Sequence, residues 1–175
     1  MNVMVPSQIN RGTKFSPCKK YRLQLWRLWD DQLPIIMFLM LNPSSADAHN
    51  DDPTIRRCVN FTKNWGYGGF YIGNLYPLIS SKPKLLLESL SVSHSENKLN
   101  LDEMAEKCDK IICAWGNFEI VKKLGIPNDF LIDYKNKLYY ISKSKNETPK
   151  HPLYLKSSLK LKKYNKLNIN NINSL

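Results

Sequence analysis

The stretch that decides the fold is Ile35-Ile36-Met37-Phe38-Leu39-Met40-Leu41, followed at once by Asn42-Pro43. Seven apolar residues follow one another here, and the Asn-Pro pair ends the run as a turn would. A continuous apolar run of this length is typical of a strand buried on both faces, as in a parallel sheet covered by helices. The stretch therefore predicts a buried parallel strand.

The segment that follows carries the signals of a helix. Asp52 is a suitable N-cap, Pro53 suits the first helical position, and Gly66 suits the stop. One face combines residues at i, i+3 and i+4 spacing, namely Ile55, Cys58, Val59, Thr62 and Trp65. The pattern predicts an amphipathic helix that begins at Pro53 and ends before Gly66.

Strand and helix patterns alternate along most of the chain. Further strands are predicted at residues 21–25, 70–74, 110–115 and 137–141, and further helices at residues 83–90, 95–108 and 118–124. We expect residues 1–17 to be irregular, and the last 20 residues to be a frayed helix or disordered. The alternation predicts an α/β fold: a three-layer α/β/α domain over residues 1–155, with a central, mostly parallel sheet of four to five strands. A basic, Asn-rich tail over residues 156–175 follows this domain.

The composition fits one globular domain. The chain has 175 residues, of which 42% are hydrophobic and 23% charged, unlike a disordered chain. The longest apolar run, residues 33–41, contains Pro34 and is far shorter than a membrane span. The first residues show no signal-peptide pattern, and the four cysteines form no Cys-x-x-Cys pair. We expect a cytoplasmic monomer without a disulfide framework, a metal site or contact with membranes.

Positive charge is concentrated near the C-terminus. The whole chain carries a formal net charge of +11, and residues 134–175 hold 10 lysines against one glutamate, which places +9 there. Such a field attracts polyanions, nucleic acid first. AT-rich coding alone also produces the Lys/Asn bias of the tail. The charge therefore favours a nucleic-acid partner without establishing one.

Unusual polar segments lie where the predicted strands end. In a parallel sheet, ligands bind outside the carboxyl ends of the strands, where the loops begin. Four segments lie at such positions: Asn42-Pro43-Ser44-Ser45-Ala46-Asp47, Asn74-Leu75-Tyr76-Pro77, Gly116-Asn117 and Pro149-Lys150-His151-Pro152. Their convergence predicts a functional site at this edge of the sheet.

The residues around these segments resemble a known family. The run MLNPSSADAHNDDPTIRRCVNFTKNWGYGGFYIGNLYPL, which covers residues 40–78, is preceded by FSPCKKYRLQLWRLWD and followed by AWGN and PKHPLYL. These strings are similar to a bacterial and phage family catalogued as domain of unknown function 1643, over about residues 15–155. The family itself implies no biochemical activity.

A more distant similarity is to the uracil-DNA glycosylase superfamily. Its members carry four comparable features in the same chain order: Asn or Asp beside Pro after a strand, a base-reading Asn at a strand end, Trp-Gly at a strand end, and a late His-Pro. The corresponding residues here are Asn42-Pro43, Asn74, Trp115-Gly116 and His151-Pro152. This resemblance implies a uracil-DNA-glycosylase-like fold and hydrolysis of the N-glycosidic bond of a base, natural or modified, in DNA.

The resemblance implies roles that suit the chemistry of these residues. Cleavage of an N-glycosidic bond needs a positioned water, a donor for the departing base and a site for a flipped nucleotide. Asn42 would orient the water, His151 would donate to the leaving base, and Asn74 would read the edge of the base. The expected substrate-binding residues are Asn74, Pro43, Ser44, Ser45, Asp47, Tyr76, Trp115, Gly116, Asn117, Arg56 and Lys150. The reaction requires neither a metal nor an organic cofactor.

Two other functions fit the sequence. In the first, the chain is a binding module that recognises a nucleotide or nucleic acid at the same edge and catalyses no reaction. The carboxylates and imidazole of residues 47–52 would suit Mg²⁺ or Mn²⁺ in a metal-dependent nuclease or phosphohydrolase, although Asp52 already suits a cap. The candidates also have structural explanations: Asn42 as a turn residue, Trp115 as core and His151 as an exposed loop residue.

Overall fold

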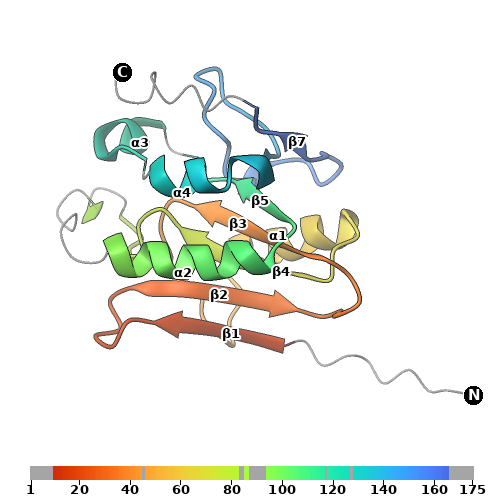
Figure 1. Cartoon of the computed structure of the whole chain (residues 1–175), viewed down its shortest axis with the longest axis horizontal. Coiled ribbons are helices and arrows are strands. Elements are labelled where there is room, and N and C mark those ends of the chain that lie inside the picture. The colour runs from red at the N-terminus through yellow and green to blue at the C-terminus, as the bar shows by residue number, and fades with distance from the viewer. Residues whose placement is uncertain are drawn as a thin grey trace, which may run out of the picture.

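The structure, a computed structural model, describes residues 10–44, 46–82, 85–86, 94–116, 118–126 and 128–165. Within these residues seven strands form one sheet in the order β1-β2-β4-β3-β5-β6-β7 (Figure 1). The strands are β1 (Asn10–Phe15), β2 (Arg22–Leu28), β3 (Ile35–Met40), β4 (Gly69–Asn74), β5 (Lys110–Cys113), β6 (Leu138–Tyr140) and β7 (Lys162–Lys163). The helices are α1 (Pro53–Asn64), α2 (His94–Lys107), α3 (Phe118–Leu124) and α4 (Asn128–Asp133), with short 3-10 helices η2 (Lys135–Lys137) and η3 (Pro152–Tyr154). The predicted α/β class is confirmed.

The centre of the sheet is parallel and its two sides are antiparallel. β3 lies between β4 and β5 and runs parallel to both, and β6 runs parallel to β5. β1 and β2 on one side, and β7 on the other, pair antiparallel. The expectation of a mostly parallel sheet of four to five strands is therefore corrected to a mixed sheet of seven strands in the described part of the chain.

β1 lies within residues 1–17, for which the sequence predicts irregular structure. Its sequence, NRGTKF, lacks apolar alternation, and most of its residues are exposed. The strand forms because its backbone pairs with β2, where Gly12 lies opposite Trp26. A Cβ at Gly12 would lie 2.2 Å from the Trp26 ring, so the missing side chain lets the indole cover β1. Apolar periodicity does not detect a strand of this kind.

Residues 156–165 belong to the domain rather than to a tail. β7 pairs with Tyr139 and Tyr140 of β6. The Trp65 indole nitrogen donates to the Leu159 backbone oxygen at 2.9 Å, and three leucines pack against the core, namely Leu155, Leu159 and Leu161. The predicted boundary at residue 155 is thus too early, and residues 166–175 lie outside the described residues.

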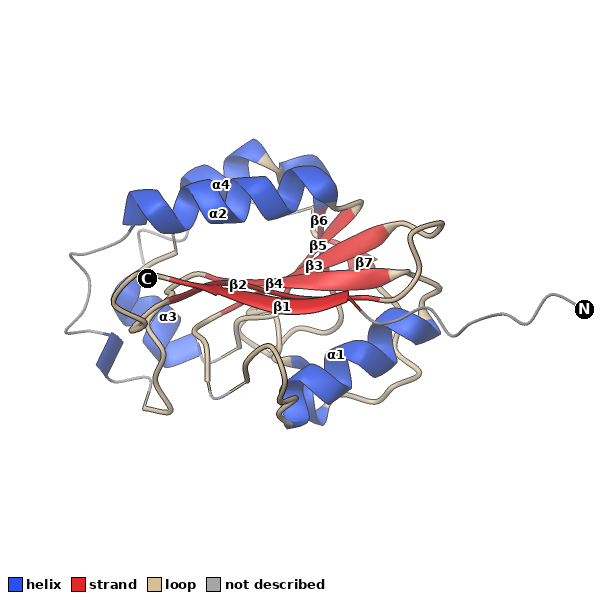
Figure 2. Ribbon diagram, turned by 90° about the horizontal axis from the view of Figure 1, so that it is seen from below, coloured by secondary structure: helices blue, strands red, loops and turns tan. Residues whose placement is uncertain are grey.

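Helices cover both faces of the sheet (Figure 2). α1 lies on one face, and α2 and α4 lie on the other. On the α1 face, Phe38 of β3 belongs to one core cluster with Ile55 and Phe61. On the opposite face, Leu39 belongs to a second cluster with Met104 of α2. The continuous apolar run of β3 is explained by this double cover.

The helix predicted after residue 52 is confirmed in detail. Asp52 caps α1 by accepting a hydrogen bond from the Ile55 N–H at 2.8 Å, Pro53 begins the helix, and Gly66 follows it with φ +80°. α2 and α3 confirm the helices predicted at residues 95–108 and 118–124. The helix predicted at residues 83–90 lies mostly outside the described residues, and α4 is not among the predicted helices. No helix in the described part of the chain is long and apolar enough to cross a membrane.

Candidate functional site at the carboxyl ends of the parallel strands

The register of the strands brings the polar segments to one edge of the sheet. Met40 of β3 pairs with Asn74 of β4, and β5 flanks β3 on its other side. The Gly116 N–H, beyond β5, donates to the Pro149 oxygen at 2.9 Å, which joins the fourth segment to the third. The segments that hold Asn42, Asn74, Gly116 and His151 therefore meet at the carboxyl edge of the parallel strands.

The side chain of Asn42 is fixed by its amide nitrogen. Nδ2 donates to the Ser80 backbone oxygen at 2.8 Å and to the Pro43 backbone oxygen at 3.1 Å. An amide group is planar, so these two bonds also fix the direction of the side-chain carbonyl. In the described part of the chain, no donor bonds to Asn42 Oδ1. The half-buried side chain thus presents an oriented acceptor.

Asn74 is the most unusual polar residue of the edge. Its side chain is only 2% exposed, and neither Oδ1 nor Nδ2 has a hydrogen-bond partner among the described residues. In β4, Asn74 shares its parity with Phe70 and Ile72, which face α1, so its amide lies on the α1 face of the sheet. Burial of an unpaired amide costs about 1–3 kcal/mol. Such a group is explained by a ligand or a water that pairs with it.

His151 is held as a neutral imidazole. Its Nδ1 accepts a hydrogen bond from the Leu153 N–H at 3.3 Å, which leaves the proton on Nε2. Burial lowers the pKa of His151 below its usual value, and the charge of Asp52 acts in the opposite direction. Nε2–H of His151 is therefore available as a donor at neutral pH.

Gly116 lies directly against His151. Its φ of +59° is in the left-handed region, and an added Cβ would lie 3.1 Å from the His151 Cβ and 3.3 Å from the His151 nitrogen. A side chain at this position would therefore displace His151. Trp115, the preceding residue, belongs to the core cluster on the opposite face from Asn74, and its indole nitrogen is buried without a partner among the described residues.

Asp52 connects the Asn42 loop to the first turn of α1. One carboxylate oxygen accepts from the Ile55 N–H at 2.8 Å, and the other accepts from the Ser44 hydroxyl at 2.7 Å. Burial lowers the pKa of both His151 and Arg22, and the charge of Asp52 partly opposes this lowering. The bond from Ser44 ties the Asn42 loop to the start of α1.

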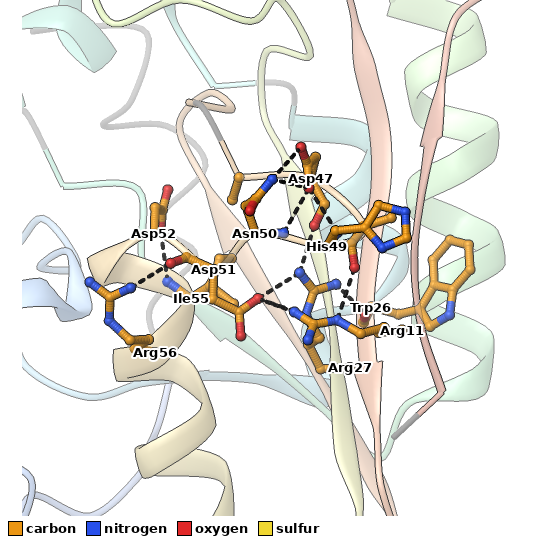
Figure 3. A network of polar contacts seen from close by, with 12 residues as sticks. Arg11, Trp26, Arg27, Asp47, His49, Asn50, Asp51, Asp52, Ile55 and Arg56 are labelled. Carbon is orange, nitrogen blue, oxygen red and sulfur yellow. Dashed lines mark hydrogen bonds and ion pairs between the residues drawn. The ribbon is translucent and has the colours of Figure 1, made fainter. Parts of the chain in front are cut away.

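Two arginines of the outer strands hold the acidic segment at residues 47–52 (Figure 3). Arg27 donates from Nε and Nη2 to Asp51 Oδ1 at 2.9 and 2.7 Å, and Nη2 also donates to the Asp47 backbone oxygen at 2.6 Å. Arg11 of β1 donates to the same Asp51 oxygen at 2.7 Å. The Arg27 side chain is 2% exposed, so this ion pair is largely shielded from solvent.

Asp47 and Arg56, both predicted to bind substrate, are engaged within this segment. Asp47 Oδ1 accepts from the Asn50 and His49 N–H groups at 2.8 and 2.7 Å, and these bonds lower the pKa of the carboxyl group to about 2. Arg56 donates to the Asp51 backbone oxygen at 2.5 Å. Among the described residues, no group of three or more His, Cys, Asp or Glu side chains could hold a metal ion. The carboxylates at residues 47–52 therefore order the loop.

The other predicted binding residues occupy different environments. Pro43 is buried, and Lys150 is exposed next to His151. The Tyr76 hydroxyl donates to the Gly125 backbone oxygen, and burial raises the pKa of Tyr76 to about 12. Two predicted residues lie outside the described residues, namely Ser45 and Asn117.

Three residues near the site are absent from the sequence-based prediction. Ser80 accepts the bond from Asn42. Asn97 of α2 donates to the Asn74 backbone oxygen at 2.9 Å and is itself 2% exposed. Arg22 is a buried arginine of β2. The sequence offers one signal, because Asn97 and Asn100 interrupt the apolar face expected of α2.

Comparison with known proteins gives one match. A family model described as "Protein of unknown function (DUF1643)" matches residues 22–153. This range contains all four polar segments at the carboxyl edge. No curated protein and no solved structure matches the chain.

Proposed function

We propose that this chain, which belongs to the DUF1643 family of proteins of unknown function, is a glycosylase-type enzyme that hydrolyses the N-glycosidic bond of a base in DNA. The proposed site is the carboxyl edge of β3, β4 and β5 on the α1 face of the sheet. The resemblance to the uracil-DNA glycosylase superfamily and to its three-layer arrangement is part of the proposal. It is supported by helices on both faces of the sheet and by the meeting of the four corresponding segments.

The observation that carries the proposal is the unpaired amide of Asn74. Both polar atoms of this side chain are buried without a partner among the described residues. An amide offers one acceptor and two donor hydrogens in one plane, which matches the edge of a nucleobase. A flipped base that leaves water would complete these hydrogen bonds.

Asn42 is the proposed water-positioning residue. Its carbonyl is oriented by the bonds from Nδ2 to Ser80 and Pro43. A water that donates to Oδ1 is held for attack on the sugar. The water oxygen bonds to C1′ while the bond from C1′ to the base nitrogen breaks, and the electron pair of that bond leaves with the base. The proton lost by the water passes to solvent or to the base.

His151 is the proposed donor to the leaving base. Negative charge develops on the base as the glycosidic bond breaks, and a donor aimed at that charge stabilises the transition state. The Leu153 N–H fixes the tautomer that leaves Nε2–H free for this bond. Gly116 lies against the backbone and Cβ of His151, so a side chain at position 116 would move this residue.

DNA is the proposed partner because the chain exposes positive charge at Lys150 and along its described C-terminal segment. Lys150 is adjacent to His151, and the described C-terminal part adds exposed lysines at positions 156, 160, 162 and 163. Exposed lysines contact phosphate without reading sequence. A binding module without chemistry would use the same residues, whereas a metal-dependent hydrolase is less well supported because Asp47, Asp51 and Asp52 already accept the bonds described above.

Product analysis tests the proposed function. The protein is incubated with DNAs that contain natural and modified bases, with and without EDTA, and small products are measured by mass spectrometry. Release of free base that EDTA does not prevent supports a glycosylase. Binding without any product supports the binding module, and phosphodiester cleavage that EDTA stops supports the metal-dependent hydrolase.

A further inference from the structure

Arg22 is a buried cation that has no carboxylate partner among the described residues. Its side chain, in β2, is 4% exposed. Nη1 donates to the Ala46 backbone oxygen at 2.6 Å, and Nε is buried with no hydrogen-bond partner among the described residues. No carboxylate of a described residue lies within ion-pair distance of it, whereas Arg27, on the same strand, is paired with Asp51.

The two arginines differ in the groups that compensate the burial of their charge. A buried charge is costly unless it is paired and hydrogen-bonded. For Arg27 that requirement is met within the chain. For Arg22, burial lowers the pKa of the guanidinium to about 10 even though the charge of Asp52 acts against this. The two Asp52 oxygens accept hydrogen bonds from Ile55 and Ser44, and neither accepts one from Arg22.

Arg22 belongs to the same edge of the sheet as the proposed site. Its backbone N–H donates to the Pro77 oxygen at 2.9 Å, just beyond the end of β4, and its guanidinium contacts Ala46 in the loop that follows Asn42. Ala46 belongs to the core cluster on the α1 face of the sheet, the face on which the Asn74 amide lies. The guanidinium therefore contacts the Asn42 loop on that face.

The chemistry of an arginine narrows the ligand that fits. An amide such as Asn74 can rotate and exchange its donor and acceptor, so alone it accepts either kind of base edge. A guanidinium has only donors and keeps its charge, so it rejects amino groups and favours acceptors, negatively charged ones most. A backbone phosphate would meet the exposed lysines first. Because the Arg22 side chain is only 4% exposed, an anion that pairs with it must belong to the part of the ligand that is enclosed by the site, which is the base.

We propose that Arg22 is a specificity-determining residue of this site, and that the site selects a base that carries an anionic substituent such as a carboxylate. The inference rests on the proposed function for the location of the base. In this arrangement Arg22 supplies the positive charge that pairs with the anionic substituent of the base, and Asn74 pairs with the edge of the ring.

Calorimetric titration with matched pairs of free bases tests the inference. The pairs are 5-carboxyuracil with 5-carbamoyluracil, and purine-6-carboxylate with purine-6-carboxamide, which differ in charge but hardly in shape. In at least one pair, the full chain should bind the carboxylate about tenfold more tightly or better, the scale of a hydrogen bond to a charged group. Arg22→Lys should keep the preference because it keeps the charge, and Arg22→Gln should remove it.

Controls separate this inference from loss of folding and from the proposed function. Lys123→Gln, which changes an exposed lysine of α3, should leave the preference unchanged. Circular dichroism reports whether each variant is folded. Equal affinity within both pairs, or no binding of any of the four bases, overturns the inference even if the protein releases bases from DNA. A carboxylate preference that depends on Arg22, in a protein that releases no base, supports the inference and contradicts the glycosylase.

Discussion

The side-chain nitrogen of Asn42 donates a hydrogen bond of 2.8 Å to the backbone oxygen of Ser80, 38 residues along the chain. Together with the bond to Pro43, it uses the donor half of the amide, and no described donor bonds to the acceptor Oδ1. These two bonds hold the side chain in one orientation. The proposed role of Asn42 in positioning a water depends on this orientation.

Replacement of Gly116 should lower the stability of the fold and shift the position of His151. Gly116→Ala places a Cβ in a left-handed backbone, which costs roughly 1–2 kcal/mol, and presses it against His151. Gly66→Ala is the matched control, because Gly66 also has positive φ but would meet no atom within 4 Å. Urea unfolding should show Gly116→Ala to be less stable than Gly66→Ala by about 1 kcal/mol or more, the scale of overpacking. Equal losses would show that Gly116 has only a conformational role.

The ion pair of Arg27 should contribute far more than that of Arg11. Both side chains contact Asp51 Oδ1, but Arg27 is 2% exposed and Arg11 is 34% exposed. Arg27→Gln leaves a carboxylate and two backbone oxygens with fewer donors, at a cost of about 3–5 kcal/mol. Arg11→Gln should cost about 1 kcal/mol or less. Chemical denaturation of the two variants measures this difference, and similar losses would show that burial of Arg27 does not strengthen its ion pair with Asp51.

His151 should make stability depend on pH. Burial depresses its pKa in the folded chain, so the unfolded chain binds a proton more readily. This contribution is fully present above the ordinary histidine pKa and is lost as the pH falls through the folded pKa. Between pH 7.5 and pH 5 (about the range of ordinary His titration), His151→Gln should therefore lose less stability than the unmodified protein. His49→Gln, which changes an exposed histidine, serves as the control. A parallel pH dependence in His151→Gln and the unmodified protein would contradict this.

The exposed lysines of residues 156–165 should govern the salt dependence of DNA binding. Because this segment packs on the domain, its removal would disturb β7, so substitution is the better test. Joint replacement of Lys156, Lys160, Lys162 and Lys163 by Gln should weaken binding and flatten the plot of log affinity against log salt. Replacement of Lys122 and Lys123 on α3 provides the comparison. An unchanged slope would mean that the Lys/Asn bias reflects coding composition alone.

The parts of the fold that the sequence predicts are those with local signals. β3, β4 and β5 follow from apolar runs, and α1 follows from Asp52, Pro53 and Gly66. β1 and β7 are not predictable in this way, because their residues are mostly exposed and their backbones pair with a partner strand.

The same distinction applies to the site. Asn42, Asn74 and His151 stand out because each lies next to a strand end or a proline. Ser80 and Asn97, the partners of Asn42 and Asn74, do not stand out in the sequence, because only contacts between distant parts of the chain identify them. In the sequence, Arg22 looks like the solvent-facing residue of an alternating strand. Its burial results from contacts with the Asn42 loop, which lies far from it in the sequence.

The most direct test of the central claim is base release by Asn42→Ala. The substitution removes the oriented carbonyl, and circular dichroism and urea unfolding check that the fold persists. Asn60→Ala, on the exposed side of α1, is the matched control. With a DNA from which the unmodified protein releases base, single-turnover assays should show no release by Asn42→Ala and normal release by Asn60→Ala. Release by Asn42→Ala at the rate of the unmodified protein would contradict the account.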